Sequence, residues 1–164
     1  MQPARIVLSD QCQVIAYCDN VAVVAPLAFG LIPLRETHRR YRVLLEEHET
    51  IGVIILLGCV PLGIPDSATR AENLRGLREL GPALALLCLV IEGSDVASQM
   101  LRTTARALNL LVGRANIVVC ASSTEAVDAC VRRVSTPLGA KRSDLLNTVA
   151  TVRAQAGAPR PAGP

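Results

Sequence analysis

The fold of this chain is decided by two apolar stretches, IGVIILLGCV at residues 51–60 and ALALLCLVI at residues 83–91. Both lack charged residues and lie next to proline or glycine, as expected for strands that are buried on both faces of a sheet. A third, shorter strand is predicted over residues 116–121. Because helical patterns separate these stretches, the strands should run parallel through crossover connections. The sequence therefore predicts an α/β fold in which helices cover a central parallel sheet.

Four helices are predicted between and after these strands. They cover residues 34–48, 66–80, 95–112 and 123–134. Asp66 or Ser67 would cap the second helix, and Ser94 would cap the third. The fourth follows the sequence Ser-Ser-Thr-Glu at 122–125, which has the spacing of a capping box. Gly81 and Gly113 would end the second and third helices.

The chain opens with a predicted antiparallel hairpin. Its strands are VIAYC at residues 14–18 and VAVVA at residues 21–25. Asp19 and Asn20 separate them, and both residue types tolerate the positive φ angles of a two-residue turn. The expected order is therefore a hairpin, three helix–strand units and a final helix.

These elements predict an α/β domain over residues 1–134 and a C-terminal extension over residues 135–164. Within the extension, a short amphipathic helix is predicted over residues 143–155. The apolar residues on one side of this helix are Leu145, Leu146, Val149 and Val152. That side would dock on the domain or on a partner, or would provide an oligomer contact. The Pro-rich tail at 158–164 is predicted to be disordered.

Composition limits the classes of function. The chain has 164 residues, of which 51% are hydrophobic, and this fits one folded domain rather than a disordered chain. Seventeen Lys and Arg against fourteen Asp and Glu leave a formal charge of only +3, and there are two Tyr, one Phe and no Trp. So few basic and aromatic groups argue against nucleic-acid binding. No uncharged run reaches the roughly 20 residues of a membrane-spanning helix, so no span is expected.

The cysteines predict a reducing compartment. They are Cys12, Cys18, Cys59, Cys88, Cys120 and Cys130. None forms a C-x-x-C pair or has a neighbouring histidine, so free thiols are expected, with no metal and no cofactor. The first residues lack the apolar core of a signal peptide, which adds to the expectation of a cytoplasmic protein.

A functional site is expected where the parallel strands end. In an open parallel sheet, the loops at the carboxyl ends of the strands meet at one edge. Here these loops span residues 59–69, 92–95 and 120–124, and each leads into a helix N-terminus, where N–H groups favour a negative partner. The hydroxyl groups in these loops belong to Ser67, Thr69, Ser94, Ser122, Ser123 and Thr124. Helix capping is the simplest role for each of them.

Enzyme chemistry has little support in the sequence. A Ser or Cys nucleophile needs an activating base, and the only histidines, His38 and His48, both lie on the first predicted helix. We therefore expect no catalysis. The alternative is a small-molecule-binding domain or enzyme at the strand ends that uses Cys59, Glu92 and Ser94. Arg70 or Arg102 would assist in that case.

The element order resembles the STAS domain, the fold of anti-sigma-factor antagonists and of sulfate-transporter cytosolic domains, over residues 13–134. The sequence IPDSAT at 64–69 falls where that family has Asp-Ser-Ser-Gly at the start of a helix. Ala68 and Thr69 stand in place of the second serine and the glycine. The stretch VIEGS at 90–94 is similar to divergent bacterial STAS-like proteins.

The resemblance implies a non-catalytic regulatory module that binds a protein partner, either a kinase or an anti-sigma-like regulator. Ser67 matches the serine that the partner kinase phosphorylates in the antagonists. The residues implied in partner binding are Asp66, Ser67, Thr69, Glu92, Ser94, Ser122 and Ser123. A phosphate would add about −1.5 to −2 charges to this surface, and it would switch binding without any catalysis by this chain.

Overall fold

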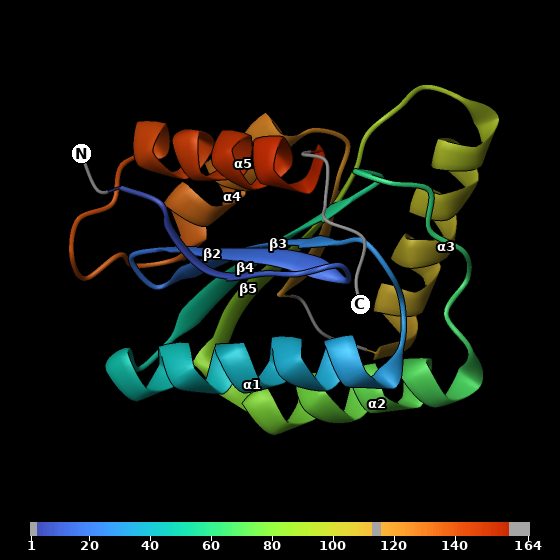
Figure 1. Ribbon diagram of the computed structural model, residues 1–164, viewed down its shortest axis with the longest axis horizontal. Coiled ribbons are helices and arrows are strands. Elements are labelled where there is room, and N and C mark those ends of the chain that lie inside the picture. The colour runs from blue at the N-terminus through green and yellow to red at the C-terminus, as the bar shows by residue number, and fades with distance from the viewer. Residues whose placement is uncertain (1–2, 113–115, 158–164) are drawn as a thin grey trace.

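The computed structural model describes residues 3–112 and 116–157, which form a mixed six-stranded sheet with helices on both faces (Figure 1). The strands follow one another across the sheet in chain order: β1 (Arg5–Ser9), β2 (Gln13–Cys18), β3 (Val21–Pro26), β4 (Ile51–Leu57), β5 (Leu84–Ile91) and β6 (Ile117–Cys120). The first three strands are antiparallel, and β3 to β6 are parallel. The predicted α/β fold, with its hairpin and three parallel strands, is confirmed.

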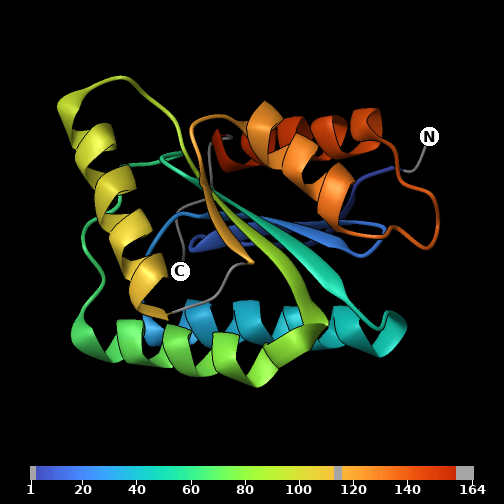
Figure 2. The same cartoon turned by 180° about the vertical axis from the view of Figure 1, so that it is seen from behind.

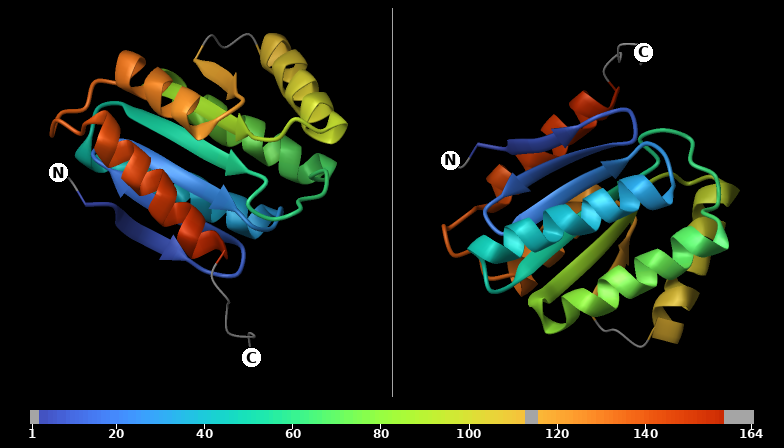
Figure 3. Two further views of the ribbon diagram at one scale, coloured as in Figure 1. Left: turned by 90° about the horizontal axis from the view of Figure 1, so that it is seen from above. Right: turned by 60° about the horizontal axis from the view of Figure 1, so that its bottom comes forward.

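The helices complete two layers around this sheet. They are α1 (Leu31–Glu47), α2 (Ser67–Leu80), α3 (Val96–Val112), α4 (Ser123–Arg133) and α5 (Arg142–Gly157). The helices α1 and α2 cover one face, and α4 and α5 cover the other (Figure 3). The helix α3 stands at the edge of the sheet beside β6 (Figure 2). None of the helices in the described ranges is long and apolar enough to cross a lipid bilayer.

Alternation along the strands divides the core into two clusters. In β3, Val21 and Val23 face α4 and α5, whereas Ala22 and Val24 face α1 and α2. Successive residues of a strand point to opposite faces, so a strand can be apolar throughout only where both faces are covered. The continuous apolar stretches of the sequence are therefore explained by two covered faces.

Several element boundaries differ from the prediction. The first helix begins at Leu31, three residues early, because Pro33 is tolerated in the first turn of a helix. The strand predicted over residues 51–60 ends at Leu57, since Gly58 has a φ angle of 97°, which breaks the extended backbone. The prediction missed β1, a largely exposed edge strand whose apolar run is only three residues long, Ile6 to Leu8.

The C-terminal helix α5 is packed on the domain. Leu145, Val149 and Val152 are buried in the same cluster as the α4 side of the sheet. The face that the sequence suggested as an oligomer contact is therefore covered by β2 and β3 of the same chain. The predicted disordered tail at 158–164 and the predicted helix end at Gly113 lie outside the described residues.

The packing of α5 predicts a large loss of stability on truncation of Leu145. Leu145→Ala should lower the free energy of unfolding by about 2–5 kcal/mol, because the side chain is fully buried and its removal leaves a cavity. Leu138→Ala, at a residue that is 66% exposed, is the matched control and should change it little. Urea unfolding followed by circular dichroism measures both. Similar losses for the two variants would contradict a core role for α5.

Candidate functional site

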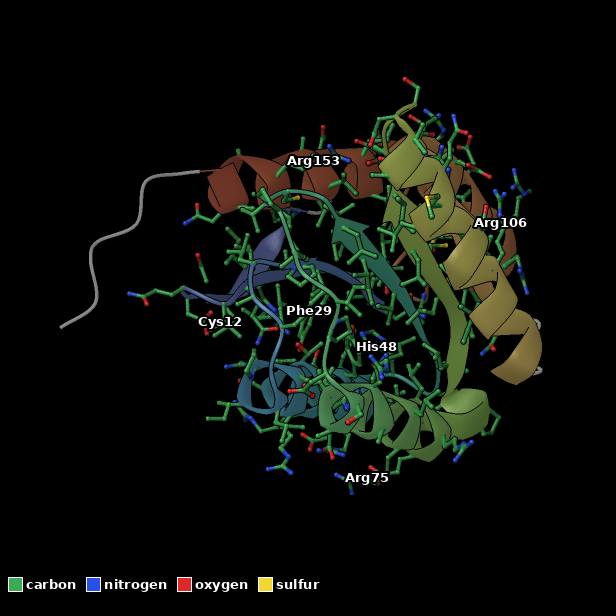
Figure 4. All side chains as sticks on the ribbon, turned by 90° about the vertical axis from the view of Figure 1, so that its right-hand side faces the viewer. Cys12, Phe29, His48, Arg75, Arg106 and Arg153 are labelled. Atoms are coloured by element: carbon green, nitrogen blue, oxygen red, sulfur yellow. The ribbon has the colours of Figure 1, made fainter. Side chains whose placement is uncertain are left out.

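The carboxyl ends of β4, β5 and β6 lie at one edge of the sheet. Leu57 at the end of β4 pairs with Ile91 at the end of β5, and Val90 pairs with Cys120 at the end of β6. The loops that follow these strands therefore gather at a common edge, as predicted. Figure 4 faces this edge and shows Arg153 of α5 at its upper side and Phe29, from the loop after β3, below it.

Ser67 is exposed at the first position of α2. Of the two predicted capping residues, Asp66 forms the cap, since its Oδ1 accepts a hydrogen bond from the Thr69 backbone N–H at 2.7 Å. Hydrogen bonds from Thr69 hold the pKa of the Asp66 carboxyl below its usual value. The Thr69 side chain is buried. Thus Ser67 is the hydroxyl of this segment that faces solvent without serving as the cap.

Glu92 and Ser123 are brought into direct contact. Glu92 Oε1 accepts hydrogen bonds from the backbone N–H and the hydroxyl of Ser123, both at 3.0 Å. The Arg153 guanidinium approaches the same oxygen to 2.7 Å and donates to Ser123 Oγ at 2.6 Å. Burial raises the pKa of Glu92, but the bonds from Arg153 and Ser123 outweigh it, so the net shift is downward. A carboxylate of the chain itself therefore occupies the N-terminus of α4.

Sequence reasoning missed Arg153. The residue follows Val152 on α5, and the amphipathic pattern of that helix indicates which residues are buried. The pattern does not indicate which loop the helix approaches. That information depends on the docking of α5 across the sheet, a long-range contact without a local signal.

Cys59 has the properties of a core thiol rather than a nucleophile. Its side chain is partly buried and packs against the cluster on the α4 side. Burial raises the pKa of the thiol; the Arg153 guanidinium opposes this and the Glu92 carboxylate adds to it. Since the thiolate is the reactive form, this environment weakens the nucleophile.

The remaining predicted hydroxyl groups have different positions. Ser122 caps α4, its Oγ accepting the Glu125 N–H at 3.1 Å, while Glu125 Oε2 accepts the Ala121 N–H at 2.7 Å. The predicted capping box is therefore present, except that the Glu125 carboxylate binds the N–H of Ala121 instead of the N–H of the capping residue Ser122. The prediction that Ser94 caps α3 is wrong. Asp95 does so, because its longer carboxylate reaches both the N–H and the hydroxyl of Ser98.

The two arginines considered for a catalytic site bind main-chain oxygens instead. Arg70 donates to the Pro65 carbonyl at 2.6 Å. Arg102 donates to the carbonyls of Ile91 and Gly93 at 2.7 and 2.8 Å. Both guanidinium groups thereby hold the loops of this edge in place.

Exposed apolar side chains gather around the same edge. Of the ten large apolar side chains that are exposed in residues 3–112 and 116–157, six lie in or just after the loops that leave β3, β4 and β5. These six are Phe29, Ile32, Ile64, Val96, Met100 and Leu101. We call them the apolar rim. Ile64 is 90% exposed and Val96 is 72% exposed, so neither contributes to the core.

His38 lies away from this edge, between α1 and α2, where it is buried. A Cβ atom on Gly76 would lie 2.0 Å from its ring, so α2 can approach only because residue 76 is glycine. Burial lowers the pKa of His38, and a hydrogen bond with Asn73 partly opposes the shift. A groove of about 440 Å³ beside it is lined mainly by arginine and glutamate side chains that pair with one another.

In the part of the chain that the structure describes, no three side chains of His, Cys, Asp or Glu are grouped to hold a metal ion. Compared with known proteins, the chain matches no family model, no curated sequence and no solved structure.

The buried position of His38 predicts a pH dependence of stability. Because the folded pKa is below the unfolded value, the unfolded state binds more protons as the pH falls below about 6.5. The free energy of unfolding should therefore decrease between pH 7.5 and pH 5.5. His38→Gln should reduce this decrease, whereas the control His48→Gln should retain it. Chemical unfolding at several pH values tests this, and an unchanged slope in His38→Gln would contradict it.

Proposed function

We propose that this chain is a non-catalytic regulatory module that binds a partner protein through the carboxyl edge of its sheet, with phosphorylation of Ser67 as the switch. The observation that carries this function is the apolar rim, together with the exposed Ser67 at the start of α2, on the same edge of the sheet. Contiguous exposed apolar groups are typical of protein interaction sites. The partner would present apolar groups of its own to Ile64, Val96 and Met100.

The switch has a direct physical basis. Ser67 follows Ile64 by three residues, so the backbones of the phosphorylated residue and of the most exposed residue of the apolar rim would lie within about 10 Å of each other. The α2 N-terminus would tolerate the negative charge within the chain. An apolar partner surface would have to desolvate that charge on docking, and this opposes binding.

The polar groups at the same edge support binding rather than catalysis. Glu92, Ser123 and Arg153 bind one another, and Cys59 is in an environment that raises its pKa. A small-molecule site or enzyme that used Cys59, Glu92 and Ser94 would need these groups to turn toward a substrate. Ser94 is not part of the cluster, and its carbonyl accepts a hydrogen bond from Gln99.

The proposal includes the kind of protein and its location. The element order is compatible with a STAS-like domain, which favours a kinase or an anti-sigma-like regulator as partner. A cytoplasmic location is supported by the six cysteines, which are free thiols in the structure.

The apolar rim predicts that a charge at Ile64 or Met100 weakens partner binding. Aspartate at either position should raise the Kd about tenfold or more, since an apolar contact at the centre of an interface contributes more than about 1.4 kcal/mol. Val131→Asp places the same charge on an exposed valine of α4 outside the rim and should leave the Kd unchanged. A partner captured from native lysate would be purified and its Kd measured by calorimetry. An equal effect of the control would contradict the location of the interface.

The switch predicts different behaviour of two Ser67 variants. Ser67→Asp should weaken binding of the same partner, because it places a negative charge beside Ile64, whereas Ser67→Ala should bind as the unmodified chain does. Phosphatase treatment of chain isolated from native cells should increase its binding. Equal affinity of the two variants would contradict the switch and leave a constitutive binding module.

A further inference from the structure

Three buried oxygen atoms without a hydrogen-bond partner belong to residues at the opposite end of the sheet. Five buried side-chain atoms in residues 3–112 and 116–157 lack a partner, and three of these are the Oδ1 atoms of Asp19, Asn20 and Asp144. The exposed fractions of these residues are 8%, 0% and 3%. Asp19 and Asn20 form the turn between β2 and β3, and Asp144 lies in the first turn of α5.

The two carboxylates are held on adjacent main-chain amides. Asp19 Oδ2 accepts the N–H groups of Leu138 and Ala140 at 2.9 and 3.2 Å. Asp144 Oδ2 accepts the N–H of Lys141, the residue that follows Ala140, at 3.0 Å. The backbone of residues 138–141 therefore places both carboxyl groups side by side, each with its second oxygen unpaired.

Asn20 provides the neutral third oxygen. Its Nδ2 donates to the carbonyls of Thr50 and Ser135, both at 2.8 Å, which fixes the orientation of the amide. The two bonds leave Oδ1 as the free end of a side chain that is fully buried. An amide whose N–H groups are both bound by carbonyl acceptors presents its oxygen in a fixed direction.

The electrostatics of this arrangement favour a positive partner. Burial of a carboxylate without a counter-charge is costly, and two such groups at one place also repel each other. Within the described residues, neither Asp19 nor Asp144 forms an ion pair with a basic side chain. Main-chain N–H groups satisfy one oxygen of each carboxylate and leave the net charge in place.

We propose that Asp19, Asn20 and Asp144 bind a hard divalent cation, Ca²⁺ or Mg²⁺, between the β2–β3 turn and the start of α5. Carboxylate and amide oxygens are the ligands that these ions prefer, and Ca²⁺ takes 6–8 of them. Water and main-chain carbonyls would complete the shell. The ion would neutralise the two carboxylates and fasten α5 to the hairpin. This site is separate from the carboxyl edge, so it does not depend on the proposed partner.

The test compares wild type with Asp144→Asn after treatment with EDTA and dialysis. Asn keeps the acceptor for the Lys141 N–H and removes one charge. Addition of Ca²⁺ or Mg²⁺ at about 100 times Kd should raise the melting temperature of the wild type by about 5–10 °C and that of the variant by much less. Without added ion, the variant should melt at or above the temperature of the wild type, because one buried charge has been removed.

Two further variants and a direct titration keep the outcome decisive. Asp19→Asn should behave like Asp144→Asn, since Asn tolerates the φ angle of 55° at this turn. Asp95→Asn, which makes the same charge change on α3, should respond to the ions as the wild type does. Calorimetric titration of the wild type with each ion measures binding independently of the variants and distinguishes Ca²⁺ from Mg²⁺. Absence of binding of both ions, or equal stabilisation of Asp144→Asn and wild type, would overturn the proposal.

Discussion

The parallel ladder from β3 to β6 is the constraint on which the rest of the structure depends. Its strands are apolar on both faces, so helices must cover both faces before the chain is stable. Parallel connection also fixes the direction of every strand. The carboxyl ends of β4, β5 and β6 are therefore at one edge, and the β2–β3 turn is at the other. The apolar rim and the buried group of Asp19, Asn20 and Asp144 therefore lie at opposite ends of the sheet.

At the carboxyl edge, the chain neutralises its own polar groups and leaves its apolar groups exposed. Glu92 occupies the N-terminus of α4 and is held by Arg153, while Arg70 and Arg102 bind loop carbonyls. A catalytic edge would need the reverse, with polar groups free to meet a substrate. The exposed side chains of Ile64, Val96 and Met100 have no such internal partners, and this distribution favours recognition of an apolar surface.

Much of the fold was predictable because its signals are local. The buried strands, the Asp19–Asn20 turn and the capping box at Ser122 each depend on a few neighbouring residues. By contrast, β1 is a half-exposed edge strand whose pattern is weak, and it becomes a strand only by pairing with β2. The positions of Ser67 and Glu92 at the edge followed from strand direction. Arg153 and the α5 packing depend on contacts between distant parts of the chain, for which a single sequence carries no signal.

Polar side chains differ in solvent exposure between the two ends of the sheet, and the difference has a structural cause. At the carboxyl edge, the Arg153 and Glu92 side chains reach one another and are each 38% exposed, so they remain partly solvated. At the amino end, the segment that leads into α5 lies against the β2–β3 turn, and Asp19, Asn20 and Asp144 are buried. Oxygens shielded in this way keep their need for a partner, and bulk solvent no longer supplies it. The same packing that completes the core on the α5 side thus creates a place where a cation is the natural complement.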